Sequence, residues 1–252
     1  MLTSTSVRLL SASLSILIIV LVCGSQSSAQ EQRPASNDDQ LAAPKQLELA
    51  DTLWRKSITR VLDRAMENYN NQPVESEADL EKNVEKMALK AFELYKSAAS
   101  KGDSEAQYKA AMIYKEGRLN SHANFPIIDP DPMAATDLFK KSADQGNDKA
   151  QFEYGMCHLN GTQIPKNDKE AVAWLKRSSS QGNALAQEVL GLCFAKGEGI
   201  EKDFVQAYMW FNLAASAGNE DCVGRRERTA TFMTPKQIEK AQQLSREWKP
   251  NQ

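Results

Sequence analysis

The stretch of sequence that decides the fold is AVAWLKRSSSQGNALAQEVLGLCFAKGEGIEKD, residues 171–203. Its pattern recurs around four glycines, Gly102, Gly146, Gly182 and Gly218, at intervals of 44, 36 and 36 residues. Relative to each glycine, an alanine stands eleven residues before, a bulky side chain seven before, and two small residues four and three before. Asp or Asn follows the glycine directly, and a small residue stands four after it. These matched columns identify an internal repeat with a period typical of helical solenoids.

Each repeat is predicted to form two helices, called helix A and helix B below. The columns before the glycine fall on one face of a 3.6-residue period, which predicts helix A. The glycine ends helix A, and the Asp or Asn after it caps helix B. A second glycine, Gly117, Gly161 or Gly197, ends helix B in three repeats. Because one hairpin is unable to bury its apolar face alone, the repeats are expected to stack into a solenoid.

The repeat resembles the Sel-one-like repeat family, a relative of the tetratricopeptide repeat. The third repeat carries the family pattern at Trp174, Leu175, Gly182, Ala186, Leu190, Gly191, Gly197, Gly199 and Asp203. The period of 36 residues favours this family over the 34-residue tetratricopeptide repeat. The resemblance covers about residues 88–224. It implies an all-α solenoid of about four helical-hairpin repeats with a capping helix at each end.

The expected segments are a signal peptide at 1–29, a disordered tether at 30–46, an N-terminal capping helix at 47–72, repeats at 77–224, and a C-terminal capping helix and tail at 225–252. Within the repeats the boundaries fall at about 88–130, 131–166, 167–202 and 203–224. The fourth repeat is expected to be partial, because its pattern degenerates after Cys222 into the charged run Arg225–Arg228. Thr234, Pro235 and Gln237 are predicted to cap the last helix.

The N-terminus predicts export. Arg8 precedes the apolar run at residues 14–22, which is shorter than the roughly 20 residues of a membrane-spanning helix. Ser27 and Ala29 are small enough to precede a signal-peptidase cut after Ala29. A lipoprotein acylated at Cys23 is the alternative, although Val22 is bulky for that processing site. We therefore expect a periplasmic or extracellular protein with no membrane span after cleavage.

Composition argues against several classes of function. The chain has 31 Lys+Arg against 33 Asp+Glu, so it lacks the positive charge of a nucleic-acid binder. With two histidines, an imidazole-rich zinc site is not expected, and no metal ligand is assigned. No nucleophile, phosphate-binding or dinucleotide-binding motif is present, so we predict no catalytic residue and no cofactor.

The cysteines and His158 are predicted to pack in the core. Cys157 and Cys193 occupy the same column of adjacent repeats, where equivalent helices lie about 8–10 Å apart, too far for a disulfide. Cys222 replaces the alanine of the other repeats. His158 fills an aromatic column and is expected to be packed and hydrogen-bonded, while His122 lies in an insertion.

Two surfaces are candidates for binding a protein partner. The columns twelve, nine, five and two before the glycine form a separate stripe on helix A, called the helix-A stripe below. Its candidate residues are Glu93, Asp137, Lys141 and Arg177. This stripe is either an ordinary solvated face or a groove for a protein segment. The second surface is an eight-residue insertion within Leu119–Pro130, where Phe125, Ile127 and Ile128 either fold back onto the solenoid or face a partner.

The resemblance implies a non-catalytic scaffold or adaptor, because members of the family mostly act in protein complexes. One alternative is a stoichiometric regulator of an envelope sensor or enzyme. Another is an enzyme that binds or hydrolyses β-lactams, an activity claimed for a cysteine-rich subgroup of the family. This chain lacks the paired cysteine spacing of that subgroup and any Ser-x-x-Lys motif.

Overall fold

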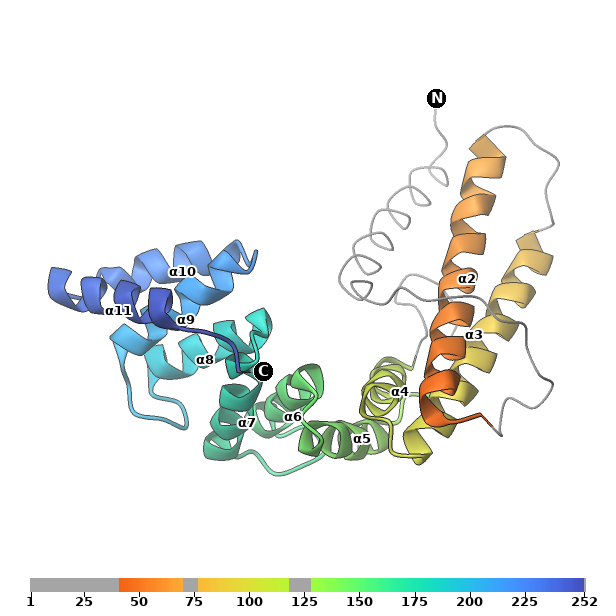
Figure 1. Ribbon diagram of the computed structural model, residues 1–252, viewed down its shortest axis with the longest axis horizontal. Coiled ribbons are helices and arrows are strands. Elements are labelled where there is room, and N and C mark those ends of the chain that lie inside the picture. The colour runs from red at the N-terminus through yellow and green to blue at the C-terminus, as the bar shows by residue number, and fades with distance from the viewer. Residues whose placement is uncertain (1–40, 70–76, 118–127, 252) are drawn as a thin grey trace. The chain divides into compact units, whose positions relative to one another are not determined.

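The computed structural model describes residues 41–69, 77–117 and 128–251. All regular secondary structure in these ranges is helical, which confirms the predicted all-α class. The chain divides into two compact units, one extending to Asp131 and one beginning at Pro132 (Figure 1).

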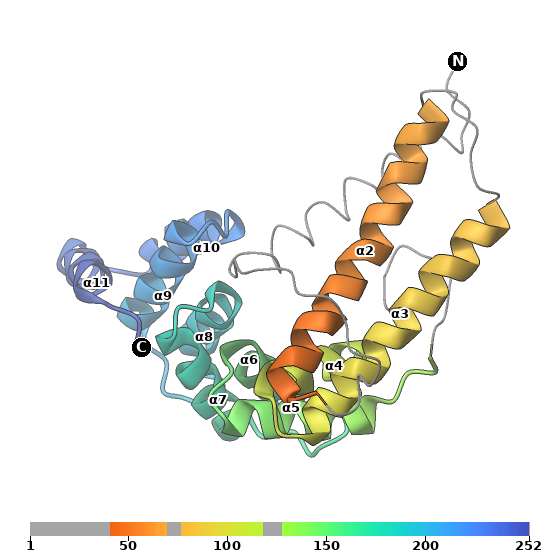
Figure 2. The same ribbon diagram turned by 45° about the vertical axis from the view of Figure 1, so that its right-hand side comes forward.

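The first unit contains a long helical hairpin followed by a shorter helix. Helix α2 (Ala43–Tyr69) and helix α3 (Glu77–Ser100) lie side by side and antiparallel, and α4 (Ser104–Glu116) follows (Figure 2). Helix α3 is helix A of the first repeat and α4 is its helix B.

The N-terminal capping helix begins at Ala43, four residues before the expected start. The assignment of residues 43–46 to a disordered tether is therefore wrong. Pro44 stands in the first turn, where a proline is compatible with a helix. The side chain of Gln46 is fully buried, and its Nε2 donates a hydrogen bond to Oγ of Ser97 at 2.9 Å. The polar composition of residues 30–46 gave no indication that Gln46 is buried.

The second unit alternates helices A and B and ends in one additional helix. Its helices are α5 (Pro132–Asp144), α6 (Asp148–Asn160), α7 (Asp168–Ser180), α8 (Ala184–Lys196), α9 (Phe204–Ser216), α10 (Asp221–Ala230) and α11 (Pro235–Glu247). Each of α5 to α9 packs against the helix that follows it, whereas α11 packs against α9.

The predicted caps between helices A and B are present in three repeats. The side chains of Asp103, Asn147 and Asn183 accept hydrogen bonds from the backbone N–H three residues later, at 2.8, 2.9 and 3.1 Å. These bonds satisfy one of the N–H groups that the first turn of each helix leaves without a partner inside the helix. At the other end of helix B, Gly197 has a φ of 81° and ends α8 in the left-handed conformation.

The fourth repeat has both of its helices. Residues 225–228 lie inside α10, so assigning them to the C-terminal cap is wrong, and that cap begins at Pro235. Helix α10 buries Cys222 and Thr229, while Arg225 pairs with Glu188 at 3.0 Å. The charged run marks a half-exposed helix face and not the end of the repeat.

Buried glutamines form a repeated contact that the sequence argument missed. Gln107, Gln151 and Gln187 stand five residues after the glycine of their repeats and are at most 5% exposed. Each Nε2 donates to the backbone carbonyl three residues before that glycine, on Ala99, Ala143 or Ser179, at 3.1, 3.2 and 3.3 Å. The recurrence of glutamine five residues after the glycine in three repeats is the sequence feature that indicates this contact. In the fourth repeat Val223 takes this position and no such bond forms there.

Candidate interaction surface

The helix-A stripe is solvent-exposed at all four of its predicted candidate residues. Glu93 has a side chain that is 67% exposed, and Asp137, Lys141 and Arg177 are also exposed. Glu93 lies in the first unit and the other three lie in the second. On α5, Asp137 and Lys141 are one helical turn apart, and Arg177 occupies on α7 the same column as Lys141. The stripe therefore carries charges of both signs.

Arg177 is held in place by an aromatic side chain. Its guanidinium carbon lies 4.4 Å from the centre of the Trp174 ring, within range of a cation–π contact. Trp174 is itself buried and meets the ring of Tyr154 edge-on at 5.3 Å. Trp174 therefore packs between α7 and α6, the helix that carries Tyr154. An arginine anchored in this way loses less side-chain freedom when it binds a carboxylate.

His158 packs against an aromatic neighbour as expected but is only half-buried, and the expected hydrogen bond is absent at its Nδ1. Its ring meets Tyr154 edge-on at 4.8 Å. Its Nδ1 is buried and has no hydrogen-bond partner. Burial also raises the pKa of the Tyr154 hydroxyl, which therefore stays protonated near neutral pH.

The stripe of the fourth repeat is covered by the C-terminal helix. In the column nine residues before the glycine, Glu93, Asp137 and Ala173 are exposed, whereas Met209 is only 6% exposed. Helix α11 packs here through Ala241 and Ser245, and the Ser245 hydroxyl lies 3.5 Å from the Met209 carbonyl.

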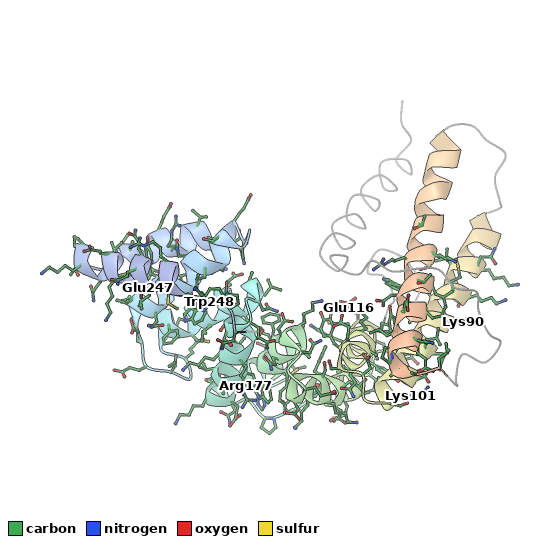
Figure 3. All side chains as sticks on the ribbon, in the orientation of Figure 1. Lys90, Lys101, Glu116, Arg177, Glu247 and Trp248 are labelled. Carbon is green, nitrogen blue, oxygen red and sulfur yellow. The ribbon has the colours of Figure 1, made fainter. Side chains whose placement is uncertain are left out.

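The residues after α11 continue along the same stripe. The Trp248 ring meets Trp210 edge-on at 6.4 Å. The backbone N–H of Asn251 donates to the carbonyl of Ser180, in the column two before the glycine of the third repeat, at 2.7 Å. Figure 3 shows Trp248 at the end of α11. The segment from Pro235 to Asn251 therefore lies over the stripe of the fourth repeat and reaches the third.

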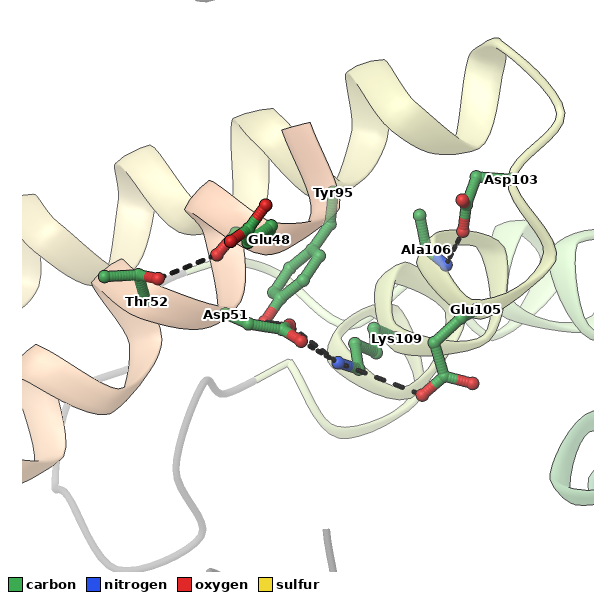
Figure 4. Close-up of polar contacts among 8 residues, drawn as sticks. All are labelled: Glu48, Asp51, Thr52, Tyr95, Asp103, Glu105, Ala106 and Lys109. Atoms are coloured by element: carbon green, nitrogen blue, oxygen red, sulfur yellow. Dashed lines mark hydrogen bonds and ion pairs between the residues drawn. The ribbon is translucent and has the colours of Figure 1, made fainter. Parts of the chain in front are cut away.

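The N-terminal capping helix is joined to the first repeat by a polar cluster (Figure 4). The Asp51 carboxylate on α2 accepts from the Tyr95 hydroxyl at 2.8 Å and from Lys109 Nζ at 2.6 Å. Glu105 lies 3.8 Å from the same ammonium. Burial, followed by the charge of Asp51, raises the pKa of Tyr95, which therefore stays a hydrogen-bond donor. Its residues lie 44 and 58 positions apart, so the periodicity of the sequence does not predict this cluster.

The insertion is described only at its end. Ile128 is half-buried. Phe125, Ile127 and His122 lie outside the described residues, so the role of the insertion stays a prediction.

Two of the three cysteines in the repeats are core residues as predicted, whereas Cys157 is only half-buried, so its assignment to the core is wrong. Cys193 and Cys222 are 1% and 0% exposed, and burial raises the pKa of each to about 11. A thiol with this pKa is protonated near neutral pH and is a poor nucleophile. The sulfur of Cys157 lies 3.9 Å from the Thr136 hydroxyl.

Among residues 41–69, 77–117 and 128–251, no three His, Cys, Asp or Glu side chains are grouped as metal ligands would be. Within the same described ranges, every helix is too short or too polar to cross a bilayer.

Comparison with known proteins agrees with the repeat pattern. The Sel1 repeat model matches residues 79–103, 104–147, 148–183 and 184–219, which together make up more than half of the chain. Each of the last three matched ranges therefore contains the helix B of one repeat followed by the helix A of the next. The comparison with curated proteins gives no match.

Two solved structures are similar to the chain. One is a Sel1 repeat protein from Oxalobacter formigenes, with 28% identity, a TM-score of 0.47, and coverage of 53% of this chain and 95% of that one. The other is c5321, a protective antigen present in uropathogenic Escherichia coli strains that displays an SLR fold, with 24% identity and a TM-score of 0.50. That match covers 82% of this chain and 53% of c5321, so the chain spans about half the length of c5321. The glycine columns, the helical hairpins and the family match lead to one conclusion: the chain belongs to the Sel1 repeat family.

Proposed function

We propose that this protein is an exported, non-catalytic scaffold that binds segments of other proteins along its helix-A stripe. One observation carries the proposal. The stripe is exposed in the nine-before column of the first three repeats, yet in the fourth repeat the chain's own C-terminal segment lies on it. A surface that already holds a polypeptide segment in one repeat is suited to hold another segment in its neighbours.

The charges of the stripe suggest which segments it would select. Lys141 and Arg177 offer donors to acidic side chains, and Asp137 offers an acceptor to basic ones. Such mixed charges favour specificity and rapid association more than raw affinity. Arg177, held over Trp174, is the residue best placed to bind a carboxylate with two parallel hydrogen bonds.

Capture of partners tests the proposal. Tagged protein lacking the signal peptide would be crosslinked in envelope extract beside a variant carrying Lys141→Glu and Arg177→Glu. The matched control carries Lys166→Glu and Lys196→Glu, the same change of charge at exposed lysines outside the stripe. We expect a partner that the control retains and the stripe variant loses. Equal capture by both variants would contradict binding through the stripe.

The insertion needs its own variant, Phe125→Ala with Ile128→Ala. Loss of one 1:1 partner from this variant, with normal capture by the stripe variant, would identify a stoichiometric regulator that acts through the insertion. Retention of all partners would leave the stripe as the binding surface.

Export and the lack of catalysis are tested separately. N-terminal sequencing of protein from the producing cell should start at Gln30, whereas a chain beginning with an acylated Cys23 would establish a lipoprotein. Incubation with a chromogenic β-lactam should give no turnover. The sequence contains no Ser-x-x-Lys nucleophile motif, and the buried Cys193 and Cys222 thiols are protonated near neutral pH. Turnover that persists through repurification would contradict a non-catalytic role.

A further inference from the structure

We propose that the stripe of the fourth repeat is a binding site for an amphipathic helix of a partner protein, and that α11 occupies this site in the free protein. The partner helix carries small residues at positions i and i+4 and an aromatic residue at i+7. This inference rests on the proposed scaffold function, and it adds the site and the chemistry of its ligand.

The fourth stripe differs in charge from the other three. Helix α9 has the sequence FVQAYMWFNLAAS, without a charged residue. The stripes of α3, α5 and α7 carry Glu93, Asp137 and Arg177. An uncharged surface selects a ligand by shape and apolar contact, so its partner differs from one that binds the charged stripe.

The occupant shows what the surface recognises. Ala241, Ser245 and Trp248 stand at i, i+4 and i+7, which places them along one face of the helix. Ala241 is fully buried and Ser245 is 9% exposed. These small side chains let α11 approach α9 closely, and Trp248 then packs against Trp210.

The attachment of α11 is shallow. Helix α11 buries two residues, whereas α7 buries six and α9 buries five. Its polar contacts to α9 are long, at 3.3 Å from Gln242 to the Tyr208 hydroxyl and 3.5 Å from Ser245 to Met209. Elements with few buried apolar side chains open at low free-energy cost.

The residues that cap the N-terminus of α11 belong to its own segment and not to the repeats. Thr234 and Gln237 form a capping box, in which each side chain accepts from the other residue's backbone N–H, and Pro235 follows Thr234. The segment therefore keeps its helix-start signal when it leaves α9. A partner helix must compete with α11 for this site. Because the connection between α10 and α11 is short, α11 is present at the site at a high effective concentration.

The test uses the chain from residue 30 with a protease site inserted between Met233 and Thr234. The probe is a fluorescently labelled peptide of residues 234–252, and its binding is followed by anisotropy before and after cleavage. Cleavage and gel filtration should release the resident segment and increase the affinity for the peptide at least tenfold. An Ala241→Glu peptide should bind at least tenfold more weakly, while Gln243→Glu, an equal charge change on the exposed face, should stay within twofold.

A second probe tests the chemistry assigned to the partner. This probe is a helical peptide of unrelated alanine, glutamine and lysine sequence that carries Ala, Ser and Trp at i, i+4 and i+7. It should displace the labelled peptide, and the same helix with Ala in place of Trp should not. Equal displacement by both helices would overturn the assigned recognition.

Hydrogen exchange of the uncut chain gives an answer even if cleavage unfolds the protein. The α11 amides should exchange at least tenfold faster than those of α9, and equal protection would overturn the proposal by identifying α11 as a fixed cap. A concentration-dependent dimer abolished by Ala241→Glu would also overturn it, because α11 would then exchange between two copies. Neither readout involves Lys141 or Arg177, so failure here is distinguishable from failure of the scaffold function.

Discussion

Gly191 on α8 lies directly against the ring of Phe211 on α9. A Cβ atom at Gly191 would stand 2.7 Å from Cε1 of Phe211, closer than carbon atoms approach without displacement. Phe211 is 1% exposed and belongs to the core shared by the third and fourth repeats, so its ring has little room to move. The glycine of this column permits the close packing of one helix B against the next helix A.

We therefore predict that Gly191→Ala destabilises the protein. The added methyl group should lower the free energy of unfolding by about 1–3 kcal/mol, the usual cost of overpacking a core. Gly224→Ala is the matched control, because Gly224 lies in α10 with no atom within 4 Å of its added Cβ. The control should gain up to about 1 kcal/mol, because alanine favours a helix over glycine. Urea titration followed by circular dichroism measures both, and a neutral Gly191→Ala would contradict the packing.

The buried glutamine column supports a second prediction. Gln187→Met keeps the size of the side chain and removes the Nε2 donor to the Ser179 carbonyl, 3.3 Å away. The substitution should lower the free energy of unfolding by about 1–2 kcal/mol, because a buried carbonyl loses a donor. Gln243→Met on the exposed face of α11 should change it by less than about 0.5 kcal/mol. Equal effects in urea titration would show that the buried bond contributes nothing.

The repeated part of the fold was predictable because the same pattern of residues recurs four times in the sequence. Column agreement predicted the helices and the Asp103, Asn147 and Asn183 caps, and the residue types of Thr234, Pro235 and Gln237 predicted the cap of α11. These features depend on residues within a few positions of one another, so periodicity and cap chemistry determine them.

The features that the sequence did not predict depend on contacts between residues that are distant in the chain. The burial of Gln46 requires Ser97, and the pairing of Arg225 requires Glu188. The polar tether and the degenerate fourth repeat were therefore misjudged from composition. The covering of Met209 by α11 also escaped prediction, because an amphipathic last helix is able to pack on either α9 or α10.

The stripe residues were predicted as exposed positions, but their partners were not. The helical period places Arg177 on the exposed side of α7, since it stands off the columns that face the core. Its position over Trp174 depends on rotamers and on the neighbouring Tyr154. Periodicity identifies a face, and the contacts within that face require the folded chain.

The third prediction concerns the attachment of the N-terminal capping helix. Lys109 and Asp51 have side chains that are 25% and 28% exposed, and the ammonium lies 2.6 and 2.8 Å from the two carboxylate oxygens. Lys109→Met should lower the free energy of unfolding by about 1–2 kcal/mol, less than for a fully buried pair because solvent still screens this one.

Lys140 provides the matched control for this ion pair. Its pair with Asp144 has a similar length, 2.7 Å, but the two side chains are 54% and 49% exposed. Lys140→Met should therefore change the free energy of unfolding by less than about 0.5 kcal/mol. Hydrogen exchange adds a local readout, because Lys109→Met should increase exchange within residues 43–57 and Lys140→Met should not. Unchanged exchange in both variants would mean that the Lys109–Asp51 pair contributes nothing to holding α2.

The last prediction concerns alkaline pH. Burial raises the pKa of Cys193 and Cys222 from 9.0 to about 11 in the folded protein. Between pH 9 and 11 the unfolded chain has therefore lost these protons while the folded chain keeps them. Because the folded state then binds more protons, its free energy of unfolding must fall as pH rises, by up to about 1.4 kcal/mol per pH unit for each thiol.

A double variant, Cys193→Ala with Cys222→Ala, isolates this effect from the titration of lysines and tyrosines. Alanine already fills the column of Cys222 in the other three repeats, so most of the cost at pH 7, about 1–2 kcal/mol, should come from the cavity at Cys193. From pH 9 to 11 the double variant should lose less stability than the native chain, so the two urea midpoints should converge and then cross. Parallel midpoints would mean that the folded protein admits water to both thiols, because only hydrated thiols would titrate alike in the folded and unfolded chains.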